Sequence, residues 1–142
     1  MITNVDLHQL VESVGDAIIV ADAHENSILW NPAATRIFGY SEAEALGKTL
    51  DLIVPERQRS KHNEGYSKSM ETGTTRYGTS LLKVPAKHKN GSTISIAFTV
   101  GMLFDETQKA SGVVAIIRDE TERFAEERAL KKRISELENP QS

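Results

Sequence analysis

The stretch that decides the fold is Ser92-Thr-Ile-Ser-Ile-Ala-Phe-Thr-Val-Gly-Met-Leu-Phe104. Large apolar side chains alternate with small or polar ones through most of it. A period of two residues is typical of a strand that buries one face and leaves the other polar. The stretch therefore predicts a long strand lying against a core. Its inward set is Ile94, Ile96, Phe98 and Val100.

Two more strands are predicted on either side of this stretch. Lys89-Asn-Gly91 precedes it, and Asn-Gly between apolar runs is a strong hairpin signal, so residues 79–87 are predicted to pair with it. Residues 105–111 form a polar loop, and residues 112–117 are almost entirely apolar. A continuous apolar run is expected where both faces of a strand are covered, so residues 112–117 are predicted to be a central strand.

The first half of the chain predicts a hairpin followed by short helices. Residues 17–20 and 27–31 are apolar runs with a turn between them. Asn31-Pro32 suits the cap and first position of a helix, and Gly39 suits the position just after its end. Ser41-Glu-Ala-Glu44 is a capping box and predicts a second short helix.

The chain is expected to be one sensor core with a helix at each end. Residues 1–14 have apolar side chains at near-helical spacing and predict an amphipathic cap helix. The core is predicted to span residues 15–118. Residues 119–142 are rich in Glu, Arg and Lys and predict a coiled-coil-like linker helix and tail, whose short seam needs a partner helix. The seam consists of Leu130, Ile134 and Leu137.

Composition excludes several functional classes. The 142 residues carry a net charge of −3 with both signs interspersed, so a nucleic-acid partner is not expected. Apolar runs fall far short of the roughly 20 residues that span a bilayer, so no membrane partner is expected. The chain has no cysteine, which excludes disulfides and thiolate-bound metals and suits the cytoplasm. No catalytic triad, carboxylate pair or phosphate loop is present, so we expect no enzyme.

The stretch from Pro55 to Met70 predicts a short helix with an imidazole at its centre. His62, Tyr66 and Met70 are spaced four residues apart, so they are predicted to share one apolar stripe of the helix. A neutral imidazole nitrogen is a common ligand of haem iron. An alternative interpretation is that His62 is an ordinary helix histidine facing solvent.

The order of the predicted elements and several short motifs together resemble a PAS domain. The resemblance covers about residues 12–125. It implies an α+β fold: a five-stranded antiparallel sheet with short helices on one face, an N-terminal cap helix and a C-terminal signal helix. The motifs are Asn31-Pro-Ala-Ala34, Phe38-Gly-Tyr-Ser-Glu42, Leu46-Gly47, Lys87-His-Lys-Asn-Gly-Ser92 and Arg118-Asp-Glu-Thr-Glu-Arg123.

Within that family, the block Leu52-Ile-Val-Pro-Glu56 with Arg59-Ser-Lys-His62 is most similar to the haem-binding FixL-type and Dos-type sensor domains. That resemblance implies a b-type haem (heme b) with His62 as the proximal ligand of the metal. It also implies that Lys68 and Arg76 anchor the haem propionates, and that Phe98 and Val100 line the distal side of the pocket. The implied cofactor-binding set is His62, Tyr66, Lys68, Arg76, Tyr77, Ser80, Leu82, Phe98 and Val100.

The chain departs from this family pattern on the distal side. FixL-type domains have an arginine that donates to bound oxygen where this chain has Leu82, and Dos-type domains have a ligand methionine where it has Ser80. An apolar distal pocket lacks the donor that bound oxygen needs. We therefore expect a mostly five-coordinate haem that favours CO or NO over O₂, compared with FixL-type domains.

The resemblance also implies partners. A PAS domain of this kind relays gas or redox state through its C-terminal helix to an output domain, such as a kinase, cyclase or phosphodiesterase of a two-component or similar system. A homodimer through the N-terminal helix and the sheet is expected. The alternative is a module that binds no cofactor, a small metabolite or a flavin such as FAD, and that acts in homodimerisation and signal relay.

Overall fold

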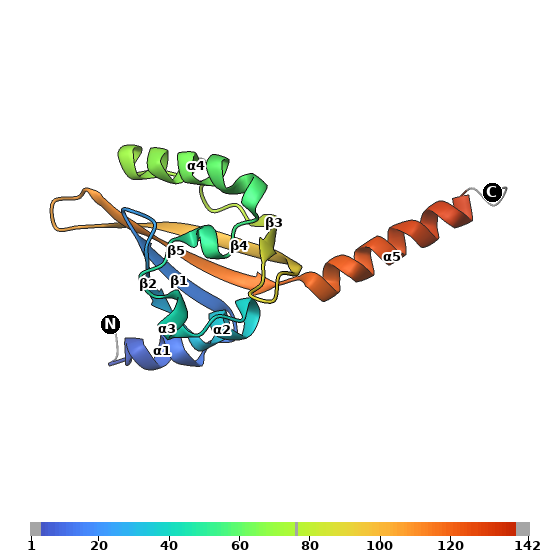
Figure 1. The fold of residues 1–142 in the computed structure, drawn as a ribbon, viewed down its shortest axis with the longest axis horizontal. Coiled ribbons are helices and arrows are strands. Elements are labelled where there is room, and N and C mark those ends of the chain that lie inside the picture. The colour runs from blue at the N-terminus through green and yellow to red at the C-terminus, as the bar shows by residue number, and fades with distance from the viewer. Residues whose placement is uncertain (1–3, 76, 139–142) are drawn as a thin grey trace.

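A five-stranded antiparallel sheet forms the centre of the computed structural model, which describes residues 4–75 and 77–138. The strand order is β2-β1-β5-β4-β3 (Figure 1), and the α+β fold class is therefore as predicted. The strands are β1 (Ala17–Asp22), β2 (Ser27–Trp30), β3 (Leu82–Lys87), β4 (Thr93–Phe104) and β5 (Ala110–Asp119). The helices are α1 (Leu7–Ser13), α2 (Pro32–Phe38), α3 (Glu42–Ala45), α4 (Arg59–Thr72) and α5 (Thr121–Glu138), with short 3-10 turns η1 (Leu50–Leu52) and η2 (Glu56–Gln58).

The apolar run around residue 115 is the central strand, as predicted. Ile117 of β5 lies opposite Ala17 of β1 on one side and Phe98 of β4 on the other. Both Ala17 and Ile117 are buried. The alternation along β4 sorts its side chains as expected, because Ile96 is buried on this face and Thr99 lies on the opposite one.

The strand predicted from residue 79 begins three residues later, at Leu82. The backbone turns before it. Gly78 adopts a positive φ of 58°, and the amide of Ser80 donates to the carbonyl of Tyr77 over 3.0 Å. A turn closed by such a bond cannot extend the β3 ladder, so residues 79–81 are connecting chain.

Helices α2 and α3 cover the face of the sheet that carries Ile117. Phe38 of α2 is fully buried, and its ring lies 5.8 Å from that of Trp30, measured between centroids. Ala34 and Ala45 are also fully buried in this cluster. Small residues at these two positions let the helix backbones approach the sheet closely, and the aromatic pair fills the space between them.

The side chain of Asn31 holds three segments together. Its Oδ1 atom accepts from the amide of Ile18 at 2.9 Å and from that of Ala34, in the first turn of α2, at 3.0 Å. Its Nδ2 atom donates to the carbonyls of Val11 at 2.9 Å and Asp16 at 3.1 Å. Asn31 is 1% exposed, so these bonds are shielded from water. The predicted helix cap therefore also ties α1 and β1 to α2.

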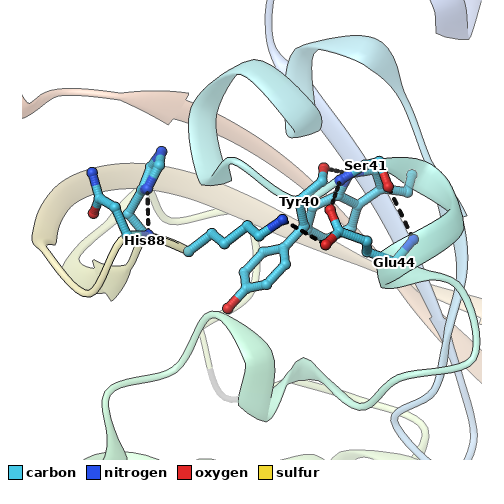
Figure 2. A network of polar contacts seen from close by, with 7 residues as sticks. Tyr40, Ser41, Glu44 and His88 are labelled. Atoms are coloured by element: carbon cyan, nitrogen blue, oxygen red, sulfur yellow. Dashed lines mark hydrogen bonds and ion pairs between the residues drawn. The ribbon is translucent and has the colours of Figure 1, made fainter.

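The β3–β4 hairpin docks on the start of α3 (Figure 2). The capping box is formed as predicted: the amide of Glu44 donates to Ser41 Oγ, and the amide of Ser41 donates to Glu44 Oε1. The remaining oxygen of Glu44 accepts from Lys89 Nζ at 2.6 Å. Beside this contact, the His88 ring lies over Gly39, where an added Cβ would be 2.5 Å from its Cε1 atom.

The last helix is attached to the sheet at its first residue. The amide of Ser95 in β4 donates to Thr121 Oγ1 at 3.0 Å, and the Ser95 carbonyl accepts from the amide of Glu120 at 2.7 Å. The Asp119 carboxylate accepts from both the amide and the hydroxyl of Thr121. Beyond this junction α5 points away from the sheet (Figure 1) and has no buried residue.

The two end helices fall inside their predicted ranges, although residues 1–3 and 139–142 lie outside the described part of the chain. The predicted seam of α5 is exposed along its whole length. None of the helices within residues 4–75 and 77–138 has the length and apolar content that crossing a bilayer requires.

Candidate functional site

Helix α4 carries His62 but is not the apolar helix that was predicted. Tyr66 is its only buried residue among fourteen. The Tyr66 hydroxyl donates to the carbonyl of Asp22 at 2.6 Å, which ties α4 to the end of β1. Met70 is only half-buried. The expected apolar stripe is wrong in one respect, because the side chain of His62 lies against acidic neighbours.

The closest charged neighbour of His62 is Glu25, in the turn between β1 and β2. Its Oε1 atom lies 2.9 Å from His62 Nδ1. The two atoms are at ion-pair distance, but they do not meet hydrogen-bond geometry. The Glu25 carboxylate raises the pKa of the His62 imidazole above its ordinary value of 6.5, and partial burial of the ring opposes that rise.

Further acceptors surround the same ring. Asp51 in η1 and Asn63 in α4 also raise the pKa of His62. One side-chain oxygen of each residue is buried without a hydrogen-bond partner, as is Oε1 of Glu25. The described residues contain no group of three or more His, Cys, Asp or Glu side chains arranged to hold a metal ion by themselves.

We expect the free energy of unfolding to fall as pH rises past the raised pKa of His62. The unfolded imidazole titrates near its ordinary value of 6.5. The stabilising contact is therefore complete below that pH and is lost as pH rises through the higher pKa of the folded state. The effect is below about 1 kcal/mol because the side chain is 37% exposed to water.

Urea unfolding at several pH values above and below 6.5 measures this slope. His62→Gln is expected to flatten it, and His24→Gln serves as the control because His24 lies exposed in the same β1–β2 turn. A slope that persists unchanged in His62→Gln would assign the pH dependence to another group.

The strand residues of the expected site lie side by side. Leu82 of β3 is opposite Phe98 of β4, and Val100 follows two positions later on the same face, opposite Ala115. Of these residues, Phe98 and Ala115 pack against the buried core. Together, Leu82, Phe98 and Val100 form an apolar stretch across β3 and β4, and their predicted role in binding a cofactor stays a prediction.

The polar residues of the expected site do not join this apolar stretch. Lys68, Tyr77 and Ser80 are exposed, and Tyr77 retains 41% of its surface. Arg76 lies outside the described residues. The sequence did not predict that Glu25, Asp51 and Asn63 lie near His62. Glu25 is 37 positions away from His62, and no short motif links the two.

Two hollows on the surface lie away from His62. One, of about 570 Å³, is lined by Pro55, Glu56, Arg57, Pro85 and Thr93. The other, of about 210 Å³, lies between α1 and β2. Neither is lined by His62 or by the apolar stretch that includes Phe98, so they do not extend the site.

Curated proteins similar to this chain include several sensors. Sensor protein FixL of Bradyrhizobium diazoefficiens is 29% identical over 131 residues, which span 92% of this chain and 26% of that protein. Oxygen sensor protein DosP of Escherichia coli is 24% identical over 108 residues, or 76% of this chain and 13% of that protein. The chain thus spans about a quarter or less of the length of these relatives.

Solved structures show the same fold. The PAS domain of a protein from Colwellia psychrerythraea superposes with a TM-score of 0.71 at 22% identity, covering 82% of this chain and 95% of that one. An RNA-binding Light-Oxygen-Voltage Receptor superposes with a TM-score of 0.70 at 19% identity, covering 91% and 36%. Residues 6–119 match the family description PAS fold, and the chain therefore belongs to the PAS family.

Proposed function

We propose that this PAS domain is a sensor that binds b-type haem through His62. The observation that carries the proposal is the state of the imidazole. Nδ1 lies 2.9 Å from the Glu25 carboxylate, and the side chain of His62 remains 37% exposed. Histidines that ligate metals characteristically present one nitrogen to a carboxylate or carbonyl and the other to the metal. FixL, a relative by sequence, is named a sensor, and DosP an oxygen sensor.

The chain offers both an imidazole and an apolar strand surface for such a group. His62 would hold the iron, and Phe98, Val100 and Leu82 would contact the porphyrin with apolar surface. Helix α4 buries only Tyr66, so little apolar contact holds it against the sheet. A weakly buried element opens at low free-energy cost, which allows a flat apolar group to enter beneath α4. When bound, the haem supplies an iron centre to which diatomic gases bind.

The chain itself offers a route from this site to the output. Phe98 and Ser95 lie on the same strand, and Ser95 bonds to both Glu120 and Thr121 at the start of α5. A shift of β4 beneath a bound group is therefore transmitted directly to the first turn of α5. The helix would couple to an output domain such as a kinase, cyclase or phosphodiesterase. Sensor histidine kinase TmoS, 24% identical over 126 residues, is one relative whose name states such an output.

The distal residues favour CO or NO over O₂. Leu82 is apolar and Ser80 is exposed in the turn before β3, so neither offers a buried donor to a polar ligand. Bound oxygen carries partial negative charge and is stabilised by such donors. Equilibrium titration of the reconstituted protein with CO and O₂ measures the preference, and a tight O₂ complex that survives Ser80→Ala would contradict it.

Loss of the imidazole is the direct test of haem binding. Titration of the protein with haemin is expected to give a Soret band with one equivalent, and His62→Ala is expected to weaken binding about 100-fold, or about 2.7 kcal/mol. His24→Ala is the matched control, since it removes an exposed histidine from the neighbouring turn. An absent band in the native protein, or an equal band in His62→Ala, would end the proposal.

We also infer that two copies associate through α1 and the outer face of the sheet. Leu7 and Leu10 on α1 are 71% and 48% exposed, and Leu103 and Ile116 are exposed on the sheet face opposite the core. Exposed apolar clusters of this kind mark association surfaces. Sedimentation of Leu7→Asp/Leu10→Asp is expected to show a monomer where the native protein is a dimer. A native protein that stays monomeric at all concentrations would contradict this.

A further inference from the structure

Helix α5 presents an apolar face to solvent. None of its 18 residues is buried, and Leu130, Ile134 and Leu137 are 63%, 53% and 68% exposed. The helix leaves the sheet at Thr121 and extends away from it (Figure 1). Helices of this length owe most of their stability in water to the packing of one face against another surface. The apolar face of α5 therefore requires a second surface.

The spacing of the three apolar residues matches the seam of a coiled coil. They follow one another at intervals of four and three residues, which places Ile134 at an a position of the heptad and Leu130 and Leu137 at d positions. A β-branched residue at a with leucine at d favours a parallel pair of helices over three or four. The seam therefore suits one further helix as its partner.

The charged residues beside the seam fit a second copy of the same helix. Glu126 and Arg133 hold g positions, Lys131 and Glu138 hold the e positions five residues later, and all of them are exposed. In a parallel pair, each g residue faces the e residue of the following heptad on the other helix. Glu126 then faces Lys131 of the other copy, and Arg133 faces Glu138. Two-fold symmetry repeats both contacts, and every one of them joins opposite charges.

The antiparallel orientation loses this charge match. In an antiparallel pair, e residues face e residues and g residues face g residues. Stacking Leu130 on Ile134 in that orientation would place Lys131 opposite Lys131 and Arg133 opposite Arg133. Like charges across an interface disfavour the arrangement that brings them together. The flanking charges therefore select the parallel orientation, in which the two sheets lie at the same end of the pair.

The seam is polar where α5 leaves the sheet. Its two preceding positions are Arg123 at d and Glu127 at a, and their side chains form an ion pair within the helix, with Nε 3.6 Å from Oε1. Charged residues at a and d positions lower the stability of helix pairing. The two helices are therefore expected to separate towards Thr121, which leaves room for a PAS core at the start of each helix.

We propose that the partner of α5 is the same helix of a second copy, paired in parallel and in register from Leu130 to Glu138. This inference deepens the proposed function, because it rests on the association of two copies through α1 and the sheet. The apolar seam alone is too short to hold two helices together in water. Association through α1 raises the effective concentration of the two α5 helices, so that they pair.

The first arm of the test exchanges charges across the interface. Glu126→Lys and Lys131→Glu each make half of the attractive contacts repulsive, so each is expected to weaken dimerisation about tenfold at low ionic strength. In the double variant these contacts again join opposite charges, and the dissociation constant is expected to return to the native value. Residues 126 and 131 lie about 140° apart around one helix, so this rescue reports contacts between copies.

Sedimentation equilibrium measures the dissociation constants of these variants. Lys132→Glu is the matched control, because it makes the same charge change as Lys131→Glu but at an f position on the outer face of the helix. Its dissociation constant is expected to equal that of the native protein. Native affinity in both single variants, or a double variant that stays as weak as the singles, would overturn the inference.

The second arm measures the orientation directly. The chain has no cysteine, so a single introduced thiol can form a disulfide only with the same residue of another copy. Leu130→Cys faces itself in a parallel pair in register. Oxidation with copper phenanthroline is expected to cross-link it at least about tenfold faster than Lys132→Cys, whose thiols point apart. Equal rates for the two variants would overturn the parallel register.

The two arms separate the possible failures. A native dimer that neither cross-links faster at residue 130 nor responds to the charge changes overturns the pairing of α5 and leaves the α1 interface standing. A protein that stays monomeric and does not cross-link overturns both. A rapid cross-link at residue 130 that persists in Leu7→Asp/Leu10→Asp supports the pairing. Neither arm uses haemin, so both results are independent of haem binding.

Discussion

Asn31→Ala is expected to lower the free energy of unfolding by about 4 kcal/mol, enough to unfold a domain of ordinary stability in part. The change leaves the amide of Ile18 and the carbonyls of Val11 and Asp16 without the partner they have now, and the amide of Ala34 keeps only its bond to the main-chain carbonyl of residue 31. Each such bond contributes about 1 kcal/mol, and more when the abandoned group stays buried. Loss of the helix cap is part of this sum.

Urea unfolding monitored by circular dichroism measures the effect, and Asn31→Asp isolates one half of it. Aspartate keeps an oxygen for the amides of Ile18 and Ala34 but has no N–H for the two carbonyls. We expect it to be destabilised as well, because a buried carboxylate would then face carbonyl oxygens. Asn26→Ala is the control, since that side chain makes no hydrogen bond within residues 4–75 and 77–138, and the change should stay near zero. A loss below about 1 kcal/mol in Asn31→Ala would show that water replaces the amide.

Gly112→Ala is expected to cost about 3 kcal/mol, because the neighbouring backbone leaves no room for a methyl group. A Cβ on Gly112 would lie 2.4 Å from the carbonyl oxygen of Ala21 in β1. That oxygen is a main-chain atom, so it cannot move away as the end of a flexible side chain would. Because β1 and β5 are adjacent at the centre of the sheet, any local separation also disturbs their ladder.

Gly101→Ala is the matched control for this substitution. It also adds a methyl group to a strand glycine, but its Cβ would meet only the Cγ1 atom of Val114, at 3.3 Å. A side-chain methyl can shift by a few tenths of an ångström, so we expect a change below about 1 kcal/mol. Thermal unfolding of both variants compares them. Equal midpoints for the two would show that β1 moves away from Gly112 at little cost.

Much of the fold was predictable because its signals are local. The alternation from Ile94 to Val100 depends only on which side chains face the core, and a period of two needs no knowledge of the partner strand. The cap at Asn31 and the capping box at Ser41 are likewise set by hydrogen bonds within four residues. Order along the chain and these motifs were sufficient for the fold and for the family.

The site was predictable only in part because its contacts join distant segments. The pairing of Leu82 with Phe98 follows from the hairpin that the Asn-Gly turn predicted. The partner of His62 was not predicted, because Glu25 sits in a polar turn where a solvated carboxylate is the usual outcome. The start of β3 was missed for a different reason: the turn at Gly78 interrupts a stretch whose composition also suits a strand.

Helix α5 is attached to the sheet at its first residue, so a small rotation there becomes a larger displacement at its far end. Its 18 residues extend about 27 Å from the junction at Thr121, at 1.5 Å per residue. A tilt of about 10° at that junction would move the far end by about 5 Å, roughly one helical turn. A displacement of the sheet that is too small to alter its hydrogen bonds is thus enlarged along α5. At the far end of the helix, it is large enough to change which residues of a partner helix α5 contacts.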